Sequence, residues 1–459
     1  MSVRDETDDL LRKIYPVFGK KTKALWYLIQ LSKDPKTAYA NQELLRLIAD
    51  KNARIDYKKE IRLPPPSPNK LQGNYHIGKV IYPSSEYSEF GLLEDEFIKH
   101  IFIAGMTGTG KTNLALHILR ELNKRKKPFL VFDWKGNYRE LKQLDDFNDL
   151  KVIRLGEKNS AFQFNPLIPP PTVDPRHWMT MLIDVIKSAF FGSHGVEYFL
   201  RKGINHLYEQ YGIYEGKKEY PAFADLEKVM QKEYVRGREM LWMSTVKRML
   251  ASLTYPSLLG ETFDVRTQQP LENLLHKKVV FEMDNLSTVE KIFFVESFLL
   301  WIYHYRKSEG KREDFKHAII IEEGHHILSG KDETAQGEEN IIETIIRMIR
   351  EFGESVIVID QEPSKISNSI LANTSCKVCF NLGNGKDIET ISRAMSLTVE
   401  ERESIDRLKI GHAIVKMKER FSEPIHVRFP LVPINKGLVN LKLNKIDISK
   451  LNFTKIQGG

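Results

Sequence analysis

Seven short apolar runs constrain the fold of this chain more than any other feature of the sequence. Each run is almost continuously hydrophobic, and amphipathic helical patterns lie between most of them. The runs are HIFIAG (100–105), KPFLVFDW (127–134), KVIRL (151–155), KKVVFEMD (277–284), HAIIIEE (317–323), SVIVIDQ (355–361) and CKVCFNL (376–382). Strands buried on both faces have this pattern, and they occur in parallel sheets covered by crossover helices. The sequence therefore predicts an α/β fold with a mostly parallel sheet.

The pattern also divides the chain into parts. Residues 1–61 place apolar residues at helical spacing and predict a small helical module, which is either a docking module or a winged-helix-like DNA binder. Residues 62–74 predict a stiff, extended linker, because consecutive prolines favour polyproline geometry. The α/β core is predicted at 75–432, with a helix-rich insertion at about 174–254 and a closing hairpin. Residues 433–459 form a basic tail.

Composition limits the class of protein without identifying it. The 459 residues are 41% hydrophobic and 28% charged, which is ordinary for a globular protein of two or three units. The net charge of +8 fits a polyanionic partner without requiring one. The most lipid-like run, 292–305, contains Glu296 and is shorter than the roughly 20 residues of a membrane span. Cys376 and Cys379 lack a second ligand pair for zinc, so we expect buried thiols in a soluble, cytoplasmic protein without membrane association.

A glycine-rich motif lies between the first apolar run and an amphipathic helical pattern. Gly105 is followed by four residues and then by Gly110, Lys111 and Thr112, which is P-loop spacing in the strand–loop–helix context that a P-loop requires. Lys111 is expected to reach the β- and γ-phosphates, and Thr112 to ligate Mg²⁺. The sequence therefore predicts a site for ATP and Mg²⁺. The other nucleotide contacts expected in the loop are Thr107, Gly108, Thr109 and Asn113.

A second motif, IIIEEGHH, ends another apolar run with two acids. A P-loop hydrolase needs one carboxylate near Mg²⁺ and another that orients or deprotonates the attacking water. Glu322 is predicted for the first role and Glu323 for the second. His325 and His326 are adjacent, whereas helical zinc ligands are spaced i, i+4, so a transition-metal site is disfavoured. Gln361, at the end of a further run, is predicted to hydrogen-bond γ-phosphate and water, with a solvated loop glutamine as the alternative.

Taken in order, these motifs resemble the HerA/FtsK superfamily of ring-forming, DNA-pumping ATPases, and most closely its HerA-like branch. The resemblance runs from about residue 77 to 431. It is carried by IGKVI, HIFIAGMTGTGKT, VFDWKGNYREL, FNPL, IIIEEGHHIL, IIRMIREFGESVIVIDQEPSKI and GHAIVKM. It implies a RecA-like core in a homo-hexamer, which hydrolyses ATP between subunits while double-stranded DNA passes through a central pore.

The resemblance also assigns roles to individual residues. It implies an arginine that reaches the neighbouring subunit's nucleotide, with Arg350 as the first choice and Arg347 as the second; for each of them the alternative is a basic face on a surface helix. Asp133 matches a family acid near the nucleotide, and His325 matches a family histidine that is expected to act as a relay toward the pore or interface.

Some positions depart from the family pattern. Glu322 stands where aspartate is commoner, Asn137 where an acid is commoner, and Glu362 where a small or basic residue is usual. HerA proteins generally begin with a small β-barrel, whereas this chain begins with a helical pattern. Any partner or docking surface assigned through the barrel is therefore left open.

The DNA contacts and the partner are expected by analogy alone. The polar loop 329–340 and the helical insertion are placed by the resemblance near the pore, where contacts to phosphate would be independent of sequence and sensitive to salt. The family implies a nuclease or other effector partner in DNA end processing or anti-phage defence. The alternatives are a soluble conjugation or packaging motor and a nucleotide-gated scaffold that regulates a partner enzyme.

Overall fold

The computed structural model describes residues 61–157, 162–310, 314–329 and 341–435, together with a few isolated positions between 27 and 47. The chain divides into two compact units, Met1–Arg62 and Leu63–Gly459. The helical module predicted at 1–61 lies almost entirely outside the described residues, and so do most of the loop at 329–340 and the basic tail from 436 onward. These predictions stay open.

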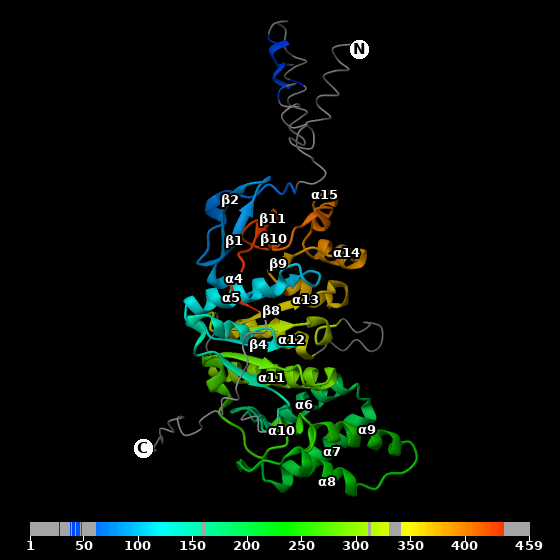
Figure 1. Cartoon of the computed structure of the whole chain (residues 1–459). Coiled ribbons are helices and arrows are strands. Elements are labelled where there is room, and N and C mark those ends of the chain that lie inside the picture. The colour runs from blue at the N-terminus through cyan, green and yellow to red at the C-terminus, as the bar shows by residue number, and fades with distance from the viewer. Residues whose placement is uncertain are drawn as a thin grey trace. The chain divides into compact units, whose positions relative to one another are not determined.

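One mixed sheet organises the described part of the second unit (Figure 1). The strands are β1 (Tyr75–Ile81), β2 (Glu86–Leu92), β3 (Ile101–Ala104), β4 (Phe129–Asp133), β5 (Lys151–Arg154), β6 (Lys278–Glu282), β7 (His317–Glu322), β8 (Glu354–Asp360), β9 (Cys376–Cys379), β10 (His412–Met417) and β11 (Ile425–Arg428). Their spatial order is β2-β1-β11-β10-β9-β3-β8-β7-β4-β6-β5. The seven strands from β9 to β5 are parallel, and β10, β11, β1 and β2 extend the sheet in antiparallel fashion.

This architecture confirms the predicted α/β fold with a mostly parallel sheet. Each of the seven apolar runs contains one parallel strand, and every residue of β3, β4, β7, β8 and β9 is buried. The closing hairpin is formed by β10 and β11. The sequence did not predict β1 and β2 as strands, because only part of each is buried and their apolar pattern is weaker.

Helices cover the sheet, and short 3₁₀ turns follow several strands. The helices are α4 (Glu94–Ile98), α5 (Lys111–Lys124), α6 (Pro175–Phe190), α7 (His194–Gln210), α8 (Phe223–Lys232), α9 (Glu239–Leu253), α10 (Gly260–Phe263), α11 (Thr288–Glu309), α12 (Ile341–Ile349), α13 (Asn368–Asn373), α14 (Gly385–Ala394) and α15 (Val399–Arg402). The 3₁₀ turns are η1 (Pro68–Lys70), η2 (Arg139–Gln143), η3 (Asp145–Phe147), η4 (Leu271–His276), η5 (Gly324–His326), η6 (Arg350–Phe352), η7 (Pro363–Lys365) and η8 (Ile405–Arg407).

The stretch predicted as an insertion, about 174–254, contains helices α6 to α9. Asp174 caps α6, because its carboxylate accepts the backbone N–H groups of Arg176 and His177. These helices lie together below the sheet in Figure 1, and α6 packs against α11. The apolar run 292–305 lies within helix α11. Among the described residues, no helix combines the length and the apolar character that crossing a bilayer would need.

A buried ion cluster connects α11 to the amino edge of the sheet. Glu354, the first residue of β8, accepts hydrogen bonds from Arg306 Nε at 2.5 Å and from His317 Nδ1 at 2.7 Å. Burial alone would raise the pKa of Glu354, but His317 and Arg306 lower it to about 2. The cluster therefore stabilises the fold only while Glu354 is ionised.

The parallel strands place several polar residues at one edge of the sheet. In parallel sheets the carboxyl ends of the strands meet at a common edge, and ligands bind there. In β3 and β8, Ala104 pairs with Asp360; in β4 and β6, Asp133 pairs with Glu282. Glu322 ends β7, between these two strand pairs. The fold thus brings the loop after β3 next to several acids from distant parts of the sequence.

Candidate nucleotide-binding site

The loop between β3 and α5 has the backbone of a P-loop. Gly108 and Gly110 have φ angles of +83° and +124°, which L side chains rarely adopt. A Cβ at Gly105 would lie 2.6 Å from Phe380 Cβ, so only glycine fits there. The Thr109 hydroxyl donates to the Met106 carbonyl at 2.7 Å and closes the loop on itself. The glycines therefore allow a tight loop at the N-terminus of α5, where backbone N–H groups can bind phosphate.

Lys111, the first residue of α5, lies inside this loop. Its Nζ donates to the carbonyl oxygens of Gly105 at 2.5 Å and Met106 at 2.9 Å. Burial lowers the pKa of Lys111 to about 8, and the carboxylate of Glu323 is the main opposing influence. The ammonium group is therefore held at the loop, close enough to Glu323 to interact with it electrostatically.

Glu323 is held by a network that includes two other predicted residues. Gln361 Nε2 donates to both carboxylate oxygens of Glu323 at 2.7 Å, and the Thr107 hydroxyl donates to Gln361 Oε1 at 2.6 Å. Lys135 Nζ forms an ion pair with Glu323 Oε1 at 2.5 Å. A continuous chain of contacts thus runs from the P-loop through Gln361 to Glu323. Lys135 was not predicted, although it lies in the quoted segment VFDWKGNYREL.

The backbone at Glu323 adopts an unusual conformation that depends on the next residue. Glu323 has φ +50° and ψ +47°, in the left-handed region that non-glycine residues seldom occupy. A Cβ at Gly324 would lie 2.5 Å from Val358 Cγ1 of β8, closer than side-chain carbons approach. Gly324 therefore lets the turn pack directly against β8, and the turn directs Glu323 toward Gln361.

Glu322 and Asp133 form a buried acidic pair beside the loop. The Tyr138 hydroxyl donates to Glu322 Oε1 at 3.0 Å, and Asp133 accepts the backbone N–H groups of Lys135, Gly136 and Tyr138. Burial and, after it, the nearby Asp133 carboxylate raise the pKa of Glu322 to about 8. Burial also raises the pKa of Asp133 despite its backbone hydrogen bonds. Burial side by side therefore disfavours the ionised forms of these two acids.

These residues fit a divalent cation bound together with phosphate. A cation beside Glu322 would relieve the electrostatic cost of the buried acids, and the Thr112 hydroxyl, in the first turn of α5, has no hydrogen-bond partner among the described residues. Mg²⁺ usually takes only one or two protein ligands and completes its shell with phosphate and water. In the part of the chain that the structure describes, no group of three or more His, Cys, Asp and Glu side chains could hold a metal ion without phosphate.

The two histidines after the acids have separate partners. The backbone N–H and Nδ1 of His325 lie 2.6 and 2.9 Å from Asp360 Oδ2, and this carboxylate raises the pKa of His325. The ring of His326 stacks on Trp134 at a centroid distance of 4.7 Å. His325 therefore fixes the turn η5 to the end of β8. The role of His325 as a relay toward the pore or interface stays a prediction.

Two acids at the carboxyl edge of the sheet were not singled out from the sequence, although a simple rule would have identified them. Asp360 and Glu282 end β8 and β6, just as Glu322 ends β7. Arg139 donates to both oxygens of Glu282 at 2.6 Å, and burial raises the pKa of Glu282 to about 7. This pair holds η2 against the sheet. A polar residue at the carboxyl end of an apolar strand was the signal available for both acids.

The predicted arginines lie away from the P-loop of their own chain. Arg350 is exposed and begins η6. It is close enough to His100 to lower the pKa of that ring, which burial lowers most, and His100 directly precedes β3. Arg350 is therefore at the amino edge of the sheet, whereas the P-loop is at the carboxyl edge. Arg347 lies one turn earlier, half-buried in α12.

Asn113 contacts the C-terminal part of the described chain. Its Nδ2 donates to the Pro430 carbonyl at 2.8 Å, and its Oδ1 accepts the backbone N–H of Val432 at 2.9 Å. The backbone N–H of Gly411 donates to the Thr109 carbonyl at 2.9 Å. The ends of the β10–β11 hairpin thus fasten the P-loop and its helix. A direct contact between Asn113 and nucleotide stays a prediction.

A parallel sheet with a P-loop after one strand and paired acids at the end of another defines a P-loop NTPase. The chain belongs to the HerA family: the model described as "Helicase HerA, central domain" matches residues 75–390. The resemblance drawn from the sequence motifs is therefore confirmed.

Individual relatives agree with this family. The DNA double-strand break repair helicase HerA of Saccharolobus solfataricus is 22% identical over 352 residues, which cover 75% of this chain and 66% of that protein. The chain thus spans just under two thirds of the length of this curated relative. Among solved structures, VirB4 of Thermoanaerobacter pseudethanolicus has a TM-score of 0.59 at 16% identity and covers 79% of this chain and 97% of its own. The plasmid coupling protein TrwB, in complex with an ATP analogue, has a TM-score of 0.58 at 12% identity, with coverages of 83% and 95%. These two likenesses show the fold.

Proposed function

We propose that this chain binds and hydrolyses ATP and uses the energy to move double-stranded DNA through a ring of six copies. The observation that carries the proposal is the chain of contacts from Thr107 of the P-loop through Gln361 to Glu323. It joins a phosphate-binding loop to a carboxylate that can act on water. The family supports the DNA-linked activity, because its matched relative is named as a DNA repair helicase.

In the proposed reaction, Lys111 and the N-terminus of α5 hold the phosphates. The Lys111 ammonium now donates to two loop carbonyls, and phosphate oxygens would take over these hydrogen bonds. Thr112 and Glu322 would hold Mg²⁺, which supplies positive charge to the β- and γ-phosphates when it is bound. Glu323 orients or deprotonates the attacking water.

Gln361 and Lys135 position Glu323 for this task. Lys135 forms an ion pair with the carboxylate, and the Gln361 side-chain nitrogen donates to both of its oxygens and fixes its direction. Because Gln361 also accepts from Thr107, a change in the P-loop on nucleotide binding would move Gln361 and release Glu323 toward water. We propose this as the way the site senses its nucleotide.

The ring is proposed because Lys111 and Lys135 are already engaged by the loop carbonyls and Glu323, and the arginine expected to stabilise the transferring phosphoryl group lies elsewhere. Arg350 is at the opposite edge of the sheet and cannot serve the P-loop of its own chain. In a ring it can reach the next subunit, where such an arginine is worth orders of magnitude in rate. Arg347, one turn away, is the second choice.

We further propose a nuclease or other effector as partner, in DNA end processing or in defence against phage. The name of the Saccharolobus relative supports end processing. A conjugation or packaging motor is the second candidate, favoured by the shared fold of VirB4 and TrwB. A nucleotide-gated scaffold is the third. The roles of residues 1–61, 62–74 and 433–459, and a cytoplasmic location, stay predictions.

DNA-stimulated ATP hydrolysis tests the proposal. Wild-type protein should hydrolyse ATP faster with long duplex DNA, and the absence of any stimulation would leave only the scaffold. Glu323→Gln should keep ATP binding and lose about 10²-fold or more of turnover, because the water loses its base. Lys111→Ala should lose ATP binding itself, as measured with a fluorescent ATP analogue. Retained turnover in Glu323→Gln would move the base to another residue.

A further inference from the structure

A second cavity lies away from the P-loop, between α13, α14 and the neighbouring ends of β9 and β10. It has a volume of about 580 Å³. Its lining includes Lys377 of β9, Lys416 and Lys418 at the end of β10, and Arg393 of α14, and it includes no acidic residue. Lys377 is next to the first residue of β9, so the cavity opens near the amino edge of the sheet, opposite the P-loop.

The strand register forces these lysines together. Lys416 pairs directly with Lys377 across the antiparallel β9–β10 ladder, and directly opposed residues have their side chains on the same face. The backbone N–H of Lys418 donates to the Ser375 carbonyl, which continues the pairing by one more step. Like charges directly opposite each other destabilise a sheet. An arrangement of this kind is unfavourable until an anion lies between the cations.

Among the residues that the structure describes, these three lysines have no anionic partner. Lys377 Nζ donates to the Thr374 carbonyl at 2.6 Å, and Lys416 Nζ donates to the Ser422 carbonyl. Among the described residues, no carboxylate forms an ion pair with Lys377, Lys416 or Lys418. Arg393 is the exception, because Glu389 pairs with it on the outer side of α14.

Lys377 makes the arrangement costly. Its side chain is 5% exposed, and a buried ammonium without a counter-charge is one of the least favourable groups in a protein interior. Burial lowers the pKa of Lys377 to about 8, and Lys418 lowers it as well, whereas the Cys376 thiol opposes both. The lysine still carries its charge at neutral pH, and a bound anion would stabilise that charge.

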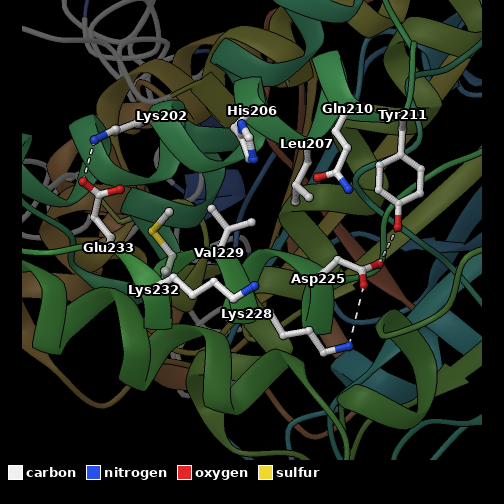
Figure 2. Close-up of a pocket in the computed structure, with 11 residues that line it drawn as sticks. Lys202, His206, Leu207, Gln210, Tyr211, Asp225, Lys228, Val229, Lys232 and Glu233 are labelled. Atoms are coloured by element: carbon white, nitrogen blue, oxygen red, sulfur yellow. Dashed lines mark hydrogen bonds and ion pairs between the residues drawn. The ribbon is translucent and has the colours of Figure 1, made fainter.

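The cavity in the helical insertion provides a contrast within the same chain. It is lined by Lys202 and Lys228, but these cations have acidic partners inside the cavity itself. Figure 2 shows Lys202 directed at Glu233 and Lys228 at Asp225; the first ion pair links α7 to the end of α8, and the second lies within α8. Two of the three lysines that line this cavity, Lys202 and Lys228, are therefore paired with carboxylates of the same lining, and Lys232 is the third. The cavity beside β9, in contrast, is lined by basic residues and by no acidic residue.

We propose that the cavity lined by Lys377, Lys416, Lys418 and Arg393 is a second phosphate-binding site, distinct from the P-loop. Clustered ammonium groups recognise phosphate oxygens through charge-assisted hydrogen bonds. Two sources share this chemistry: a compact polyphosphate that enters the cavity, and the backbone phosphates of DNA that pass its mouth. The site is defined by residues that the nucleotide site does not use, so it does not depend on ATP hydrolysis.

The test uses full-length protein that carries Lys111→Ala, which removes phosphate binding at the P-loop. In this background Lys416→Gln with Lys418→Gln should weaken binding of inorganic triphosphate, or of a 40-base-pair duplex, by about tenfold or more, because each charge-assisted hydrogen bond contributes that order of affinity. Lys416 is half-buried and Lys418 is exposed, so both changes should leave the fold intact. A thermal melt checks this directly.

Two further variants control for charge. Lys70→Gln with Lys217→Gln removes the same charge from exposed positions elsewhere and should leave both affinities unchanged. Lys416→Arg with Lys418→Arg keeps the charge and should restore binding. A loss confined to triphosphate identifies a compact ligand.

A loss confined to duplex identifies backbone phosphate. In that case the salt dependence should also become shallower, by about 0.9 in the slope of log affinity against log salt for each contact removed. If two contacts are lost, raising the salt from 50 to 200 mM should weaken DNA binding by the wild type about tenfold more than DNA binding by the variant. Unchanged affinity for both probes, or an equal loss in the Lys70 and Lys217 control, would overturn the proposal.

Discussion

Replacing Gly324 with alanine should distort the turn that carries Glu323. The new Cβ would lie 2.5 Å from Val358 Cγ1, in a strand that is buried throughout. Carbon atoms in ordinary contact are 3.4 Å or more apart, so the turn or β8 must move by close to an ångström. Overpacking of this kind costs roughly 1–3 kcal/mol. The same displacement moves Glu323 away from Gln361 and His325 away from Asp360, so kcat for ATP hydrolysis should fall as well.

The neighbouring valine provides the control. Val358→Ala removes the atom that clashes, and alone it should cost about 2–3 kcal/mol, from lost burial and the cavity left behind. In the double variant the alanine methyl at 324 fills part of that space. The two costs should therefore not add, and the unfolding free energy from urea titration should show a coupling of about 1 kcal/mol or more. Additive costs, or an unchanged stability for Gly324→Ala alone, would refute the packing argument.

Three other changes address separate contacts. Arg350→Ala should abolish ATP hydrolysis. Mixing this variant with the equally inactive Lys111→Ala variant should restore hydrolysis, because some interfaces then combine an intact P-loop with an intact Arg350 of the neighbouring subunit. No recovery of hydrolysis in the mixture would show that Arg350 does not act at the site. Lys135→Met should lower kcat by about fivefold at most with ATP binding unchanged, since Lys135 is 53% exposed and solvent screens its ion pair; a loss of ATP binding would assign the lysine to the phosphates. Acid should unfold the protein as Glu354 is protonated. The pKa of Glu354 is about 2 in the folded protein, below the usual value of about 4.3 in an unfolded chain. The contribution of Glu354 to the free energy of unfolding is therefore complete above about pH 5 and disappears toward pH 2. Circular dichroism in acid should show a shallower loss for Glu354→Gln, and identical curves would exclude this cluster as the cause.

The sequence predicted the parallel strands well because their pattern is local. Continuous apolar runs such as 355–361 and 317–323 have few alternatives to a strand buried on both faces. The P-loop was equally clear, since its glycines, lysine and threonine are adjacent in the chain. The hairpin of β1 and β2 was missed because β2 begins with exposed residues, Glu86 and Tyr87, and has no apolar run of its own.

The contacts that position Glu323, the proposed catalytic base, could not be predicted from the sequence. Lys135 and Glu323 are far apart in the chain, and nothing in either segment indicates that one turn lies over the other. They meet because β4 and β7 are neighbours, and strand order is set by packing of the whole sheet. The left-handed backbone of Glu323 is similarly a result of close packing between Gly324 and Val358. Local sequence identifies which residues carry chemistry, and long-range pairing decides which of them meet.

The hydrogen bonds between the P-loop region and the segment after β11 determine where a fragment of this protein can end. Asn113, in the first turn of α5, is bonded on both sides to the segment Pro430–Val432, more than 300 residues later. A fragment that stops at the end of the family match, residue 390, would keep every motif of the nucleotide site and lose these bonds. Because these bonds couple the two segments, we expect a fragment that lacks residues 430–432 to bind nucleotide more weakly than one that includes them.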